Sequence, residues 1–235
     1  MIAKTTYHLG LLGWPLDHSL SPTLHSTFML AARVTGKYTL YPIPPENGEH
    51  TQIKSLLNRV RDEDLNGLNI TIPYKQTVMP YLDNLTPGAC DIGAVNTIYL
   101  HQGQLTGENT DASGFIADLN RLISGTQRID RQVHKSALIL GAGGSARAVA
   151  YALSRAKWQV TIAARRIEQA QSLAADISLV DVLPLSLIPL NPTELSYQSP
   201  DLIVNTTPLG MYPHVNASPW PEELVLPPHA SVYDL

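Results

Sequence analysis

The chain has 235 residues, of which 15% are charged and 44% hydrophobic, and its formal net charge is -4. This length allows one large domain or two modest ones, whereas the composition argues against a disordered chain and against a basic surface for nucleic acid. Because Cys90 is the single cysteine, the sequence also excludes an internal disulfide and a multi-cysteine metal site.

The N-terminal residues predict a strand and no targeting segment. Residues 1–15 carry one lysine and a short apolar run broken by glycine and proline, which is too brief for a signal peptide or a membrane span. The eight histidines are scattered without metal-ligand spacing. We therefore expect a cytoplasmic protein, monomeric or homodimeric, that acts on a small-molecule substrate without a metal, a nucleic acid or a membrane as partner.

Strand-like and helical segments alternate along the first hundred residues. The expected strands are 7–14, 37–43, 68–72 and 94–100, and the expected helices are 22–35 and 48–61. The strand assignments depend on apolar and β-branched runs, and the helix assignments depend on helical spacing of apolar residues. This alternation predicts an α/β domain with a mostly parallel sheet.

A second α/β set follows a helix expected at 109–124 and a polar segment at 125–136 that is typical of a linker or an exposed loop. Its expected strands are 136–140, 158–164, 201–207 and 230–235, and its expected helices are 144–156 and 167–177. The pattern predicts two domains, 1–108 and 109–235, with the crossing near 102–110. A cleft between two domains is a usual place for a small ligand.

A glycine-rich turn opens the helix expected at 144–156. Gly141, Gly143 and Ala146 follow a buried strand in the order G-x-G-x-x-A. Glycines at such a turn let a pyrophosphate approach the backbone, where helix N–H groups and the helix dipole attract its charge. Tight strand-to-helix turns also use glycine, so a structural role stays open, but the context favours dinucleotide binding.

Two arginines follow the next expected strand, where an NAD-binding protein would place an acid. That strand ends in Arg165 and Arg166. An acid would repel a 2′-phosphate, whereas two guanidiniums can clamp it, so the pattern favours NADP. The alternative is that both arginines only solvate a helix start, although positive charge there opposes the helix dipole.

Two serines precede the first expected helix. Ser19 and Ser21 stand two residues apart, which in an extended segment points both hydroxyls to one side. Pro22 suits the first helical position, so Ser21 is expected to be the N-cap, and that role would explain it without a ligand. Ser19 is not needed for a cap, and two hydroxyls at a helix N-terminus make a seat for a carboxylate.

Lys75 and Asp111 are the candidate catalytic pair. Pro73 can open a short helix, which would place Lys75 in a first turn where the helix dipole disfavours its charge. Asp111 is expected in the first turn of the helix at the domain crossing, where an acid is also favoured structurally. A lysine at a strand end and an aspartate at the hinge could face each other across a cleft, although each alone could be an ordinary surface residue.

Three other residues are expected to be structural. Cys90 follows a Pro-Gly turn and is expected to be a buried thiol. His18 and His25 flank the serine motif. We expect the first to be a loop residue and the second to lie on a helix face.

Taken together, these motifs resemble the shikimate dehydrogenase family. The matching segments are "SLSP" (19–22), "NITIPYK" (69–75), "GAVNT" (93–97), "ENTDASG" (108–114), "GAGGSARA" (141–148), "NTTPLGM" (205–211) and "VYDL" (232–235). The resemblance implies an α/β enzyme with an N-terminal substrate domain, a Rossmann-type NADP-binding domain and a cleft between them. It also implies reversible reduction of 3-dehydroshikimate to shikimate by NADPH, a step of aromatic amino acid biosynthesis.

The resemblance also implies which residues form the site. Those for the substrate would be Ser19, Ser21, Asn69, Thr71, Lys75, Asn96 and Asp111, with Lys75 and Asp111 catalytic. Those for the cofactor would be Gly141, Ala142, Gly143, Gly144, Ser145, Ala146, Ala164, Arg165, Arg166, Thr206, Thr207 and Leu235. The family often has Asn, Arg and Thr where this chain has Ala164, Arg165 and Arg166, which removes one polar contact and adds one guanidinium.

The resemblance also exposes a difference at the end of the sequence. In the family, a Tyr-x-Pro segment and a glycine-rich stretch lead from the last strand to a helix that carries a substrate-binding glutamine. The sequence ends at Leu235, so either it covers a truncated chain or this polypeptide lacks that part of the site and of the domain packing. Two alternatives stay open: an NAD-dependent quinate/shikimate dehydrogenase, and a non-catalytic protein of the same fold that binds a shikimate-type ligand.

Overall fold

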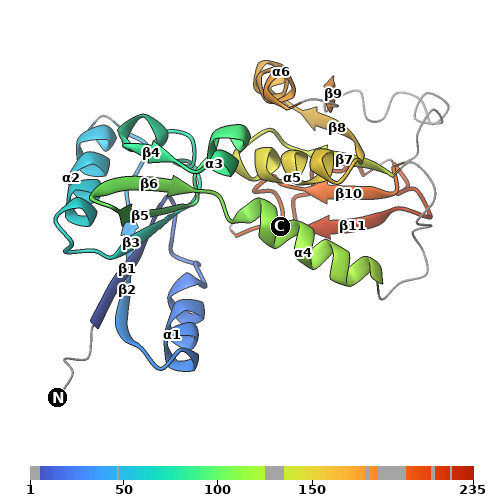
Figure 1. The fold of residues 1–235 in the computed structure, drawn as a ribbon. Coiled ribbons are helices and arrows are strands. Elements are labelled where there is room, and N and C mark those ends of the chain that lie inside the picture. Colours follow the sequence, from blue (N-terminus) through green and yellow to red (C-terminus); the bar gives the residue numbers. More distant parts are fainter. Residues whose placement is uncertain are drawn as a thin grey trace. The chain divides into compact units, whose positions relative to one another are not determined.

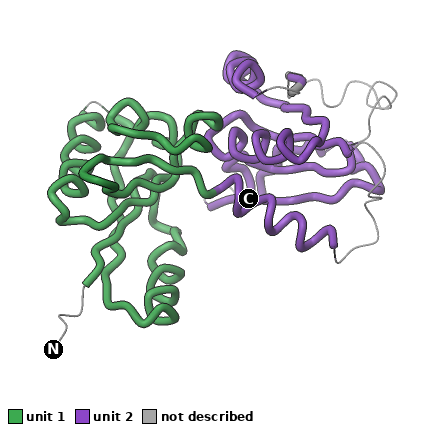
Figure 2. The backbone as a smooth tube through the Cα atoms, viewed as in Figure 1, with its two compact units in different colours: residues 1–110 green, residues 111–235 purple. Residues whose placement is uncertain are grey.

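The chain forms two compact units, residues 1–110 and 111–235 (Figure 2). The computed structural model describes residues 6–46, 48–124, 135–177, 180–184, 200–212, 215–222 and 224–235. The first unit ends at Thr110, whereas the predicted boundary lies at residue 108. Of the loop predicted at 125–136, residues 125–134 lie outside the described residues.

The first unit contains a six-stranded sheet of order β2-β1-β3-β5-β6-β4 (Figure 1). Its strands are β1 (Thr6–Gly13), β2 (Thr35–Pro42), β3 (Gly67–Ile70), β4 (Asn84–Leu85), β5 (Thr97–His101) and β6 (Gln104–Glu108). Its helical segments are α1 (Ser21–Ala31), α2 (Glu49–Arg61), η1 (Met79–Tyr81) and α3 (Pro87–Ile92). β1 is parallel to β2 and β3, whereas β5 is antiparallel to β3 and β6. The ends of β1, β3 and β6 and the start of β5 therefore lie at one edge of the sheet.

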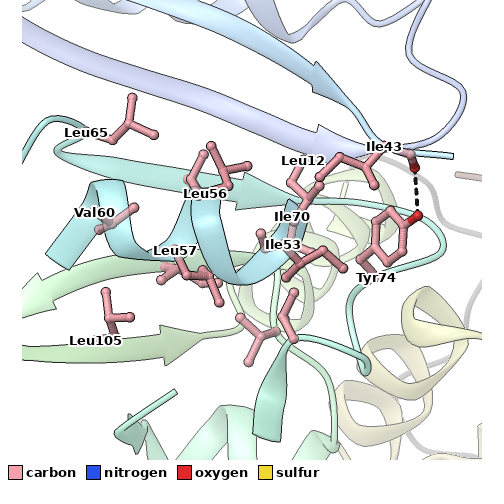
Figure 3. Close-up of a cluster of buried hydrophobic side chains, with 14 of the residues drawn as sticks. Leu12, Ile43, Ile53, Leu56, Leu57, Val60, Leu65, Ile70, Tyr74 and Leu105 are labelled. Atoms are coloured by element: carbon pink, nitrogen blue, oxygen red, sulfur yellow. Dashed lines mark hydrogen bonds between the residues drawn. The ribbon is translucent and has the colours of Figure 1, made fainter. Parts of the chain in front are cut away.

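Strand alternation decides which side chains face α2. Leu12 of β1 and Ile70 of β3 pack with Ile53, Leu57 and Val60 of that helix (Figure 3). The apolar positions of α2 recur every three or four residues, which gives the helix one continuous apolar face. This cluster is the main core of the first unit.

The opposite face of the same strands has a smaller core near α1. Leu11, the residue before Leu12, packs there with Leu16, Met29 and Tyr38. Because side chains alternate along a strand, residues next to one another in β1 serve different cores. Leu16 belongs to the loop after β1, so its burial anchors the loop that carries the two serines.

Tyr74 ties two loops to the α2-side core. Its side chain is 1% exposed, and its hydroxyl donates a hydrogen bond to the backbone oxygen of Ile43 at 2.6 Å (Figure 3). Burial raises the pKa of Tyr74 to about 12, so the hydroxyl keeps the proton that this bond needs. The bond joins the segment after β3 to the segment after β2.

The second unit contains a parallel five-stranded sheet of order β11-β10-β7-β8-β9 (Figure 1). Its strands are β7 (Ser136–Leu140), β8 (Gln159–Ala164), β9 (Val180–Pro184), β10 (Leu202–Asn205) and β11 (Ser231–Asp234). Its helices are α4 (Asp111–Ser124), α5 (Gly144–Arg155) and α6 (Ile167–Asp176). From β7 the chain builds outward to β9 and then returns to β10 on the other side of β7. This is the doubly wound Rossmann-type order, so the predicted fold class is confirmed.

Specific side chains attach the helices of the second unit. α5 packs on β7 and β8, and α6 packs on β8 and β9. Arg147 of α5 is buried and pairs with Asp176 of α6 at 2.8 Å. The Tyr233 ring on β11 meets Phe115 of α4 edge-on at 5.1 Å, and its hydroxyl donates to Asp118 at 2.8 Å.

Most predicted elements are confirmed, and the exceptions are local. The helix predicted at 22–35 ends at Ala31, because Arg33 takes a left-handed backbone conformation with φ of 56°. The strand predicted at 68–72 ends at Ile70. The elements β4, β6, β9, η1 and α3 were not predicted, since each is too short to show a clear period.

Replacing Tyr74 by Phe is expected to destabilise the chain by about 1–2 kcal/mol, because it leaves the Ile43 carbonyl unpaired in the core. Urea unfolding followed by circular dichroism measures this. Tyr7→Phe is the matched control, since the Tyr7 side chain is 37% exposed. Equal unfolding midpoints for the two variants would contradict the assignment.

Candidate functional site

The sheet of the first unit brings most of the predicted substrate residues to one edge. Ser19 and Ser21 follow β1, Thr71 and Lys75 follow β3, and Asn96 directly precedes β5. β1 and β3 are parallel, so their ends coincide, and β5 is antiparallel to β3, so its start joins them. Residues that are up to 77 positions apart in the sequence therefore lie on neighbouring loops.

Backbone hydrogen bonds hold these loops together. The N–H of Thr71 donates to the oxygen of Leu12 at 2.9 Å, and the N–H of Val95 donates to the oxygen of Lys75 at 2.7 Å. A Cβ on Gly13 would clash with the methyl group of Thr71. A glycine at the end of β1 is thus required for Thr71 to approach the serine loop.

The two serines differ from the prediction in one respect. Helix α1 already begins at Ser21, and Leu20 is the N-cap residue, with helical φ and ψ of -82° and -6° and no side-chain cap. The prediction that Ser21 is the N-cap is therefore wrong, because the helical conformation starts one residue earlier. The Ser19 oxygen instead accepts a hydrogen bond from the Ser21 N–H at 3.3 Å.

Three residues that sequence reasoning missed connect the predicted ones. Tyr38 donates from its hydroxyl to Asn69 Oδ1 at 2.9 Å, and Asn69 Nδ2 donates to Thr97 Oγ1 at 3.4 Å. The Thr97 hydroxyl donates to Asn96 Oδ1 at 3.1 Å, and Asn96 Nδ2 donates to Thr110 Oγ1 at 2.9 Å. Thr97 and Thr110 lie inside the motifs at 93–97 and 108–114, so the sequence could have indicated them. Tyr38 lies in no motif and has the pattern of an ordinary strand residue.

Lys75 is not placed by a helix. Residues 72–78 form successive turns and no helix begins at Pro73, so the helix dipole argument for Lys75 is wrong. Asp111 is the first residue of α4, and it follows Thr110, whose N–H donates to Asn96 Oδ1 at 2.9 Å. Both side chains are half-buried. Lys75 and Asp111 belong to different units, and their pairing stays a prediction.

The glycine-rich turn of the second unit lies at the switch point of its sheet, between the ends of β7 and β10. Gly141 has φ of 111°, and a Cβ there would stand 2.7 Å from Thr206 Oγ1. Nothing lies within 4 Å of a Cβ built on Gly143, and α5 begins there without a side-chain cap. The open turn and the first N–H groups of α5 therefore fit a pyrophosphate.

Arg165 and Arg166 lie between β8 and α6. β8 is the neighbour of β7 in the sheet, so the two arginines follow the strand next to the one that leads into the glycine-rich turn. Both side chains are exposed, and neither guanidinium group pairs with another residue among those that the structure describes. Two unpartnered guanidiniums fit an anionic group. The side chains of Ala146 and Ala164 are instead buried; Ala146 allows α5 to pack closely on the sheet, and both alanines offer a ligand only their backbone.

Asn205 was missed by sequence reasoning and organises the end of β10. Its Oδ1 accepts from the N–H and the hydroxyl of Thr207, at 2.9 and 2.7 Å. Its Nδ2 donates to Asp234 at 2.7 Å, and its backbone oxygen accepts from the N–H of Leu235 at 3.2 Å. The predicted cofactor residues Thr207 and Leu235 are thus brought together at the ends of β10 and β11.

Other candidate features carry no chemistry that the structure supports. Cys90 is exposed, so the prediction of a buried thiol is wrong. In the ranges described above, no group of three or more His, Cys, Asp or Glu side chains could hold a metal ion. Nor is any helix in those ranges long and apolar enough to cross a membrane.

His25 of α1 is expected to titrate with a pKa below its ordinary value of 6.5, because partial burial lowers it. Its ring stacks on Tyr38 at 4.1 Å with an interplanar angle of 15°. Since the folded chain binds this proton less readily than the unfolded chain, the associated stability is full above pH 6.5 and is lost as the pH falls. A proton NMR titration, with the signal assigned by its loss in His25→Gln, measures the pKa; a midpoint at or above 6.5 would contradict the burial effect.

Two family models match the chain in the same order as its two units. Residues 11–98 match the shikimate dehydrogenase substrate binding domain. Residues 125–207 match the shikimate / quinate 5-dehydrogenase family. Together the two matched ranges span more than half of the chain.

Individual proteins agree with the family models. A shikimate dehydrogenase (NADP(+)) of Symbiobacterium thermophilum is 37% identical over 231 residues, covering 96% of this chain and 74% of that protein. The crystal structure of shikimate 5-dehydrogenase from Thermus thermophilus in complex with NADP(H) and shikimate has a TM-score of 0.78 and 33% identity, covering 97% and 78% of the two chains. Quinate dehydrogenase from Corynebacterium glutamicum in complex with NAD has a TM-score of 0.75 and 32% identity, covering 92% and 75%. On these matches, the chain belongs to the shikimate dehydrogenase family.

Proposed function

We propose that the chain catalyses the reversible reduction of 3-dehydroshikimate to shikimate with NADPH, in the shikimate pathway of aromatic amino acid biosynthesis. The observation that carries this proposal is the open glycine turn at a sheet switch point with two exposed arginines beside it, in a chain of this family. We assign substrate binding to residues 1–110 and cofactor binding to residues 111–235. The first test is NADP reduction in the presence of shikimate.

The second unit would hold NADPH through its backbone and its arginines. The N–H groups at the start of α5, from Gly144 and Ser145, would bind the pyrophosphate. Arg165 and Arg166 would bind the 2′-phosphate, which NAD lacks. When bound, NADPH supplies the hydride that is added to the ketone carbon of the substrate.

The first unit would bind the substrate at the edge where β1 and β3 end. Ser19 and Ser21 would donate hydrogen bonds to the substrate carboxylate, with Thr71 beside them. Asn96 would bind a ring hydroxyl. Its amide is already oriented by Thr97 and Thr110, so little side-chain freedom would be lost on binding.

Lys75 would supply the proton that reduction requires. Addition of hydride to the ketone carbon leaves negative charge on the oxygen, and Lys75 would donate a proton from Nζ to that oxygen and regain one from solvent. Asp111 would accept a hydrogen bond from the adjacent ring hydroxyl and pair with Lys75. In the reverse direction Lys75 would take the hydroxyl proton. Because oxidation releases one proton overall, alkaline conditions would favour shikimate oxidation.

A second candidate is an NAD-dependent quinate dehydrogenase, since the Corynebacterium glutamicum protein of that name has a similar fold. Rates with NAD and NADP, and with quinate and shikimate, distinguish the two. A protein that binds shikimate without turnover would be neither. We also propose that the chain is cytoplasmic, because an exposed free thiol at Cys90 fits a reducing compartment, and that it is a monomer or a homodimer.

Lys75→Ala is expected to lower turnover by about 10²–10⁴-fold, the usual contribution of a general acid, and to leave the affinity for NADP unchanged. Steady-state kinetics and a binding titration measure the two quantities. Lys54→Ala, on the outer face of α2, is the matched control. Near-normal turnover of Lys75→Ala would overturn the assignment.

Asp111→Asn is expected to lower turnover as well, and its effect should not add to that of Lys75→Ala, because residues that act on one reacting group are coupled. Kinetics of the two single variants and the double variant measure the coupling. Strictly additive losses would show that Lys75 and Asp111 act independently.

Replacing Arg165 or Arg166 by Ala is expected to raise the KM for NADP by about 10- to 100-fold, the range for losing a hydrogen bond to a charged group. The KM for NAD should change little, because NAD has no 2′-phosphate. Arg155→Ala, in the last turn of α5, is the control. Equal changes with both cofactors would show that these arginines do not recognise the phosphate.

A further inference from the structure

Asp234 at the end of β11 is an exposed carboxylate that the fold holds in a fixed place. Its Oδ1 accepts a hydrogen bond from Asn205 Nδ2 at 2.7 Å. Asn205 is 9% exposed, and its remaining hydrogen bonds join the N–H and hydroxyl of Thr207 and the backbone oxygen of Leu209. Because every donor and acceptor of this amide is occupied, the amide cannot turn, and the carboxylate keeps its position at the strand end.

No neighbouring side chain neutralises the charge of Asp234. Within the described ranges, no lysine, arginine or histidine forms an ion pair with it, and its Oδ2 receives no hydrogen bond from a residue of those ranges. Holding Asn205 requires an acceptor oxygen but no charge, since the amide oxygen of an asparagine would serve equally well. The hydrogen bond to Asn205 therefore explains the position of the carboxylate and leaves its charge without a structural role.

The strand order places this carboxylate across the glycine-rich turn from the two arginines. In the order β11-β10-β7-β8-β9, the turn follows β7, whereas Arg165 and Arg166 follow β8. Asp234 is in register with Asn205, which is in register with Leu140, the residue before the turn. A dinucleotide whose pyrophosphate binds at the turn and whose 2′-phosphate binds the arginines therefore extends its nicotinamide half the other way, over the ends of β10 and β11.

We propose that Asp234 sets the redox preference of the cofactor site, by making it bind NADP⁺ more favourably than NADPH. The nicotinamide ring carries a positive charge in NADP⁺ and none in NADPH, whereas the rest of the two molecules is the same. A fixed negative charge at these strand ends attracts only the oxidised ring. The inference rests on the proposed function, which supplies the cofactor.

The consequence of this preference is a stronger hydride donor. When the site stabilises NADP⁺ relative to NADPH, transfer of hydride from the bound cofactor to the ketone carbon becomes more favourable. Asp234 takes no part in the transfer itself, since it neither gains nor loses a bond. It acts only on the charge that the nicotinamide ring acquires.

The test is the affinity of the full chain for NADP⁺ and for NADPH, each measured by calorimetric titration without substrate. Asp234→Asn is expected to raise the Kd of NADP⁺ by about 3- to 10-fold, the size of a charge interaction over two strand spacings at a protein surface. The Kd of NADPH should stay within about twofold. Because asparagine keeps an acceptor for Asn205, this variant removes the charge and preserves the hydrogen bond.

Asp181→Asn on β9 is the matched control. It removes the same charge from an exposed side chain of the other edge strand, at a position that pairs with Thr161 in the middle of β8. Both affinities should remain unchanged in this variant. A loss of structure caused by Asp234→Asn would weaken NADP⁺ and NADPH alike, so equal changes in both Kd values, or no change in either, would overturn the proposal.

A second measurement needs no variant. In the unchanged chain, added salt should weaken the binding of NADP⁺ relative to that of NADPH, because salt screens the attraction between the carboxylate and the oxidised ring. The phosphates are common to both cofactor forms, so their screening cancels in the ratio of the two Kd values. A ratio that does not respond to salt would contradict the proposal.

The same titrations distinguish this proposal from the proposed function. If the unchanged chain binds both cofactor forms but does not reduce NADP with shikimate, the enzymatic function is wrong and the two Kd values still decide the role of Asp234. If the unchanged chain binds neither form, both are wrong.

Discussion

The register of β3 on β1 is the constraint on which the candidate substrate site depends. In this register Leu12 pairs with Ile70 and Leu11 pairs with Asn69. The first pair belongs to the core beneath α2, and Asn69 faces Tyr38 on the other side of the sheet. A slip of one residue would exchange the faces, bury Asn69 among leucines and expose Ile70. The apolar core therefore enforces the position of the polar network.

At its glycine turn, the second unit orients polar groups through the backbone. Its parallel strands end at one edge, and the strand order reverses there between β7 and β10. Glycines at that place bring the chain close to Thr206 and leave the start of α5 open. In the first unit side chains are oriented by other side chains, whereas here the N–H groups are oriented by the helix itself.

Much of the fold could be predicted from the sequence, because the hydrophobic period of a long segment indicates whether it forms a helix or a strand. The strand at 136–140 was predicted to the residue, and α5 and α6 each to within one. Short elements such as β6 were not predicted, since five residues are too few to show a clear hydrophobic period. The N-cap at Leu20 and the turns that carry Lys75 were not predicted either. In both places the packing of the surrounding loop determines the backbone conformation.

The sequence by itself determined the fold class, the family and the motif residues, from Ser19 to the arginines after β8, because each of these is encoded within a short stretch of chain. Only the tertiary structure decided how those residues are oriented. Tyr38, Thr97 and Asn205 act through hydrogen bonds to residues on other strands or in loops at the strand ends. A hydrogen bond between distant residues depends on sheet register and on which face a side chain takes, and neither can be read from local spacing.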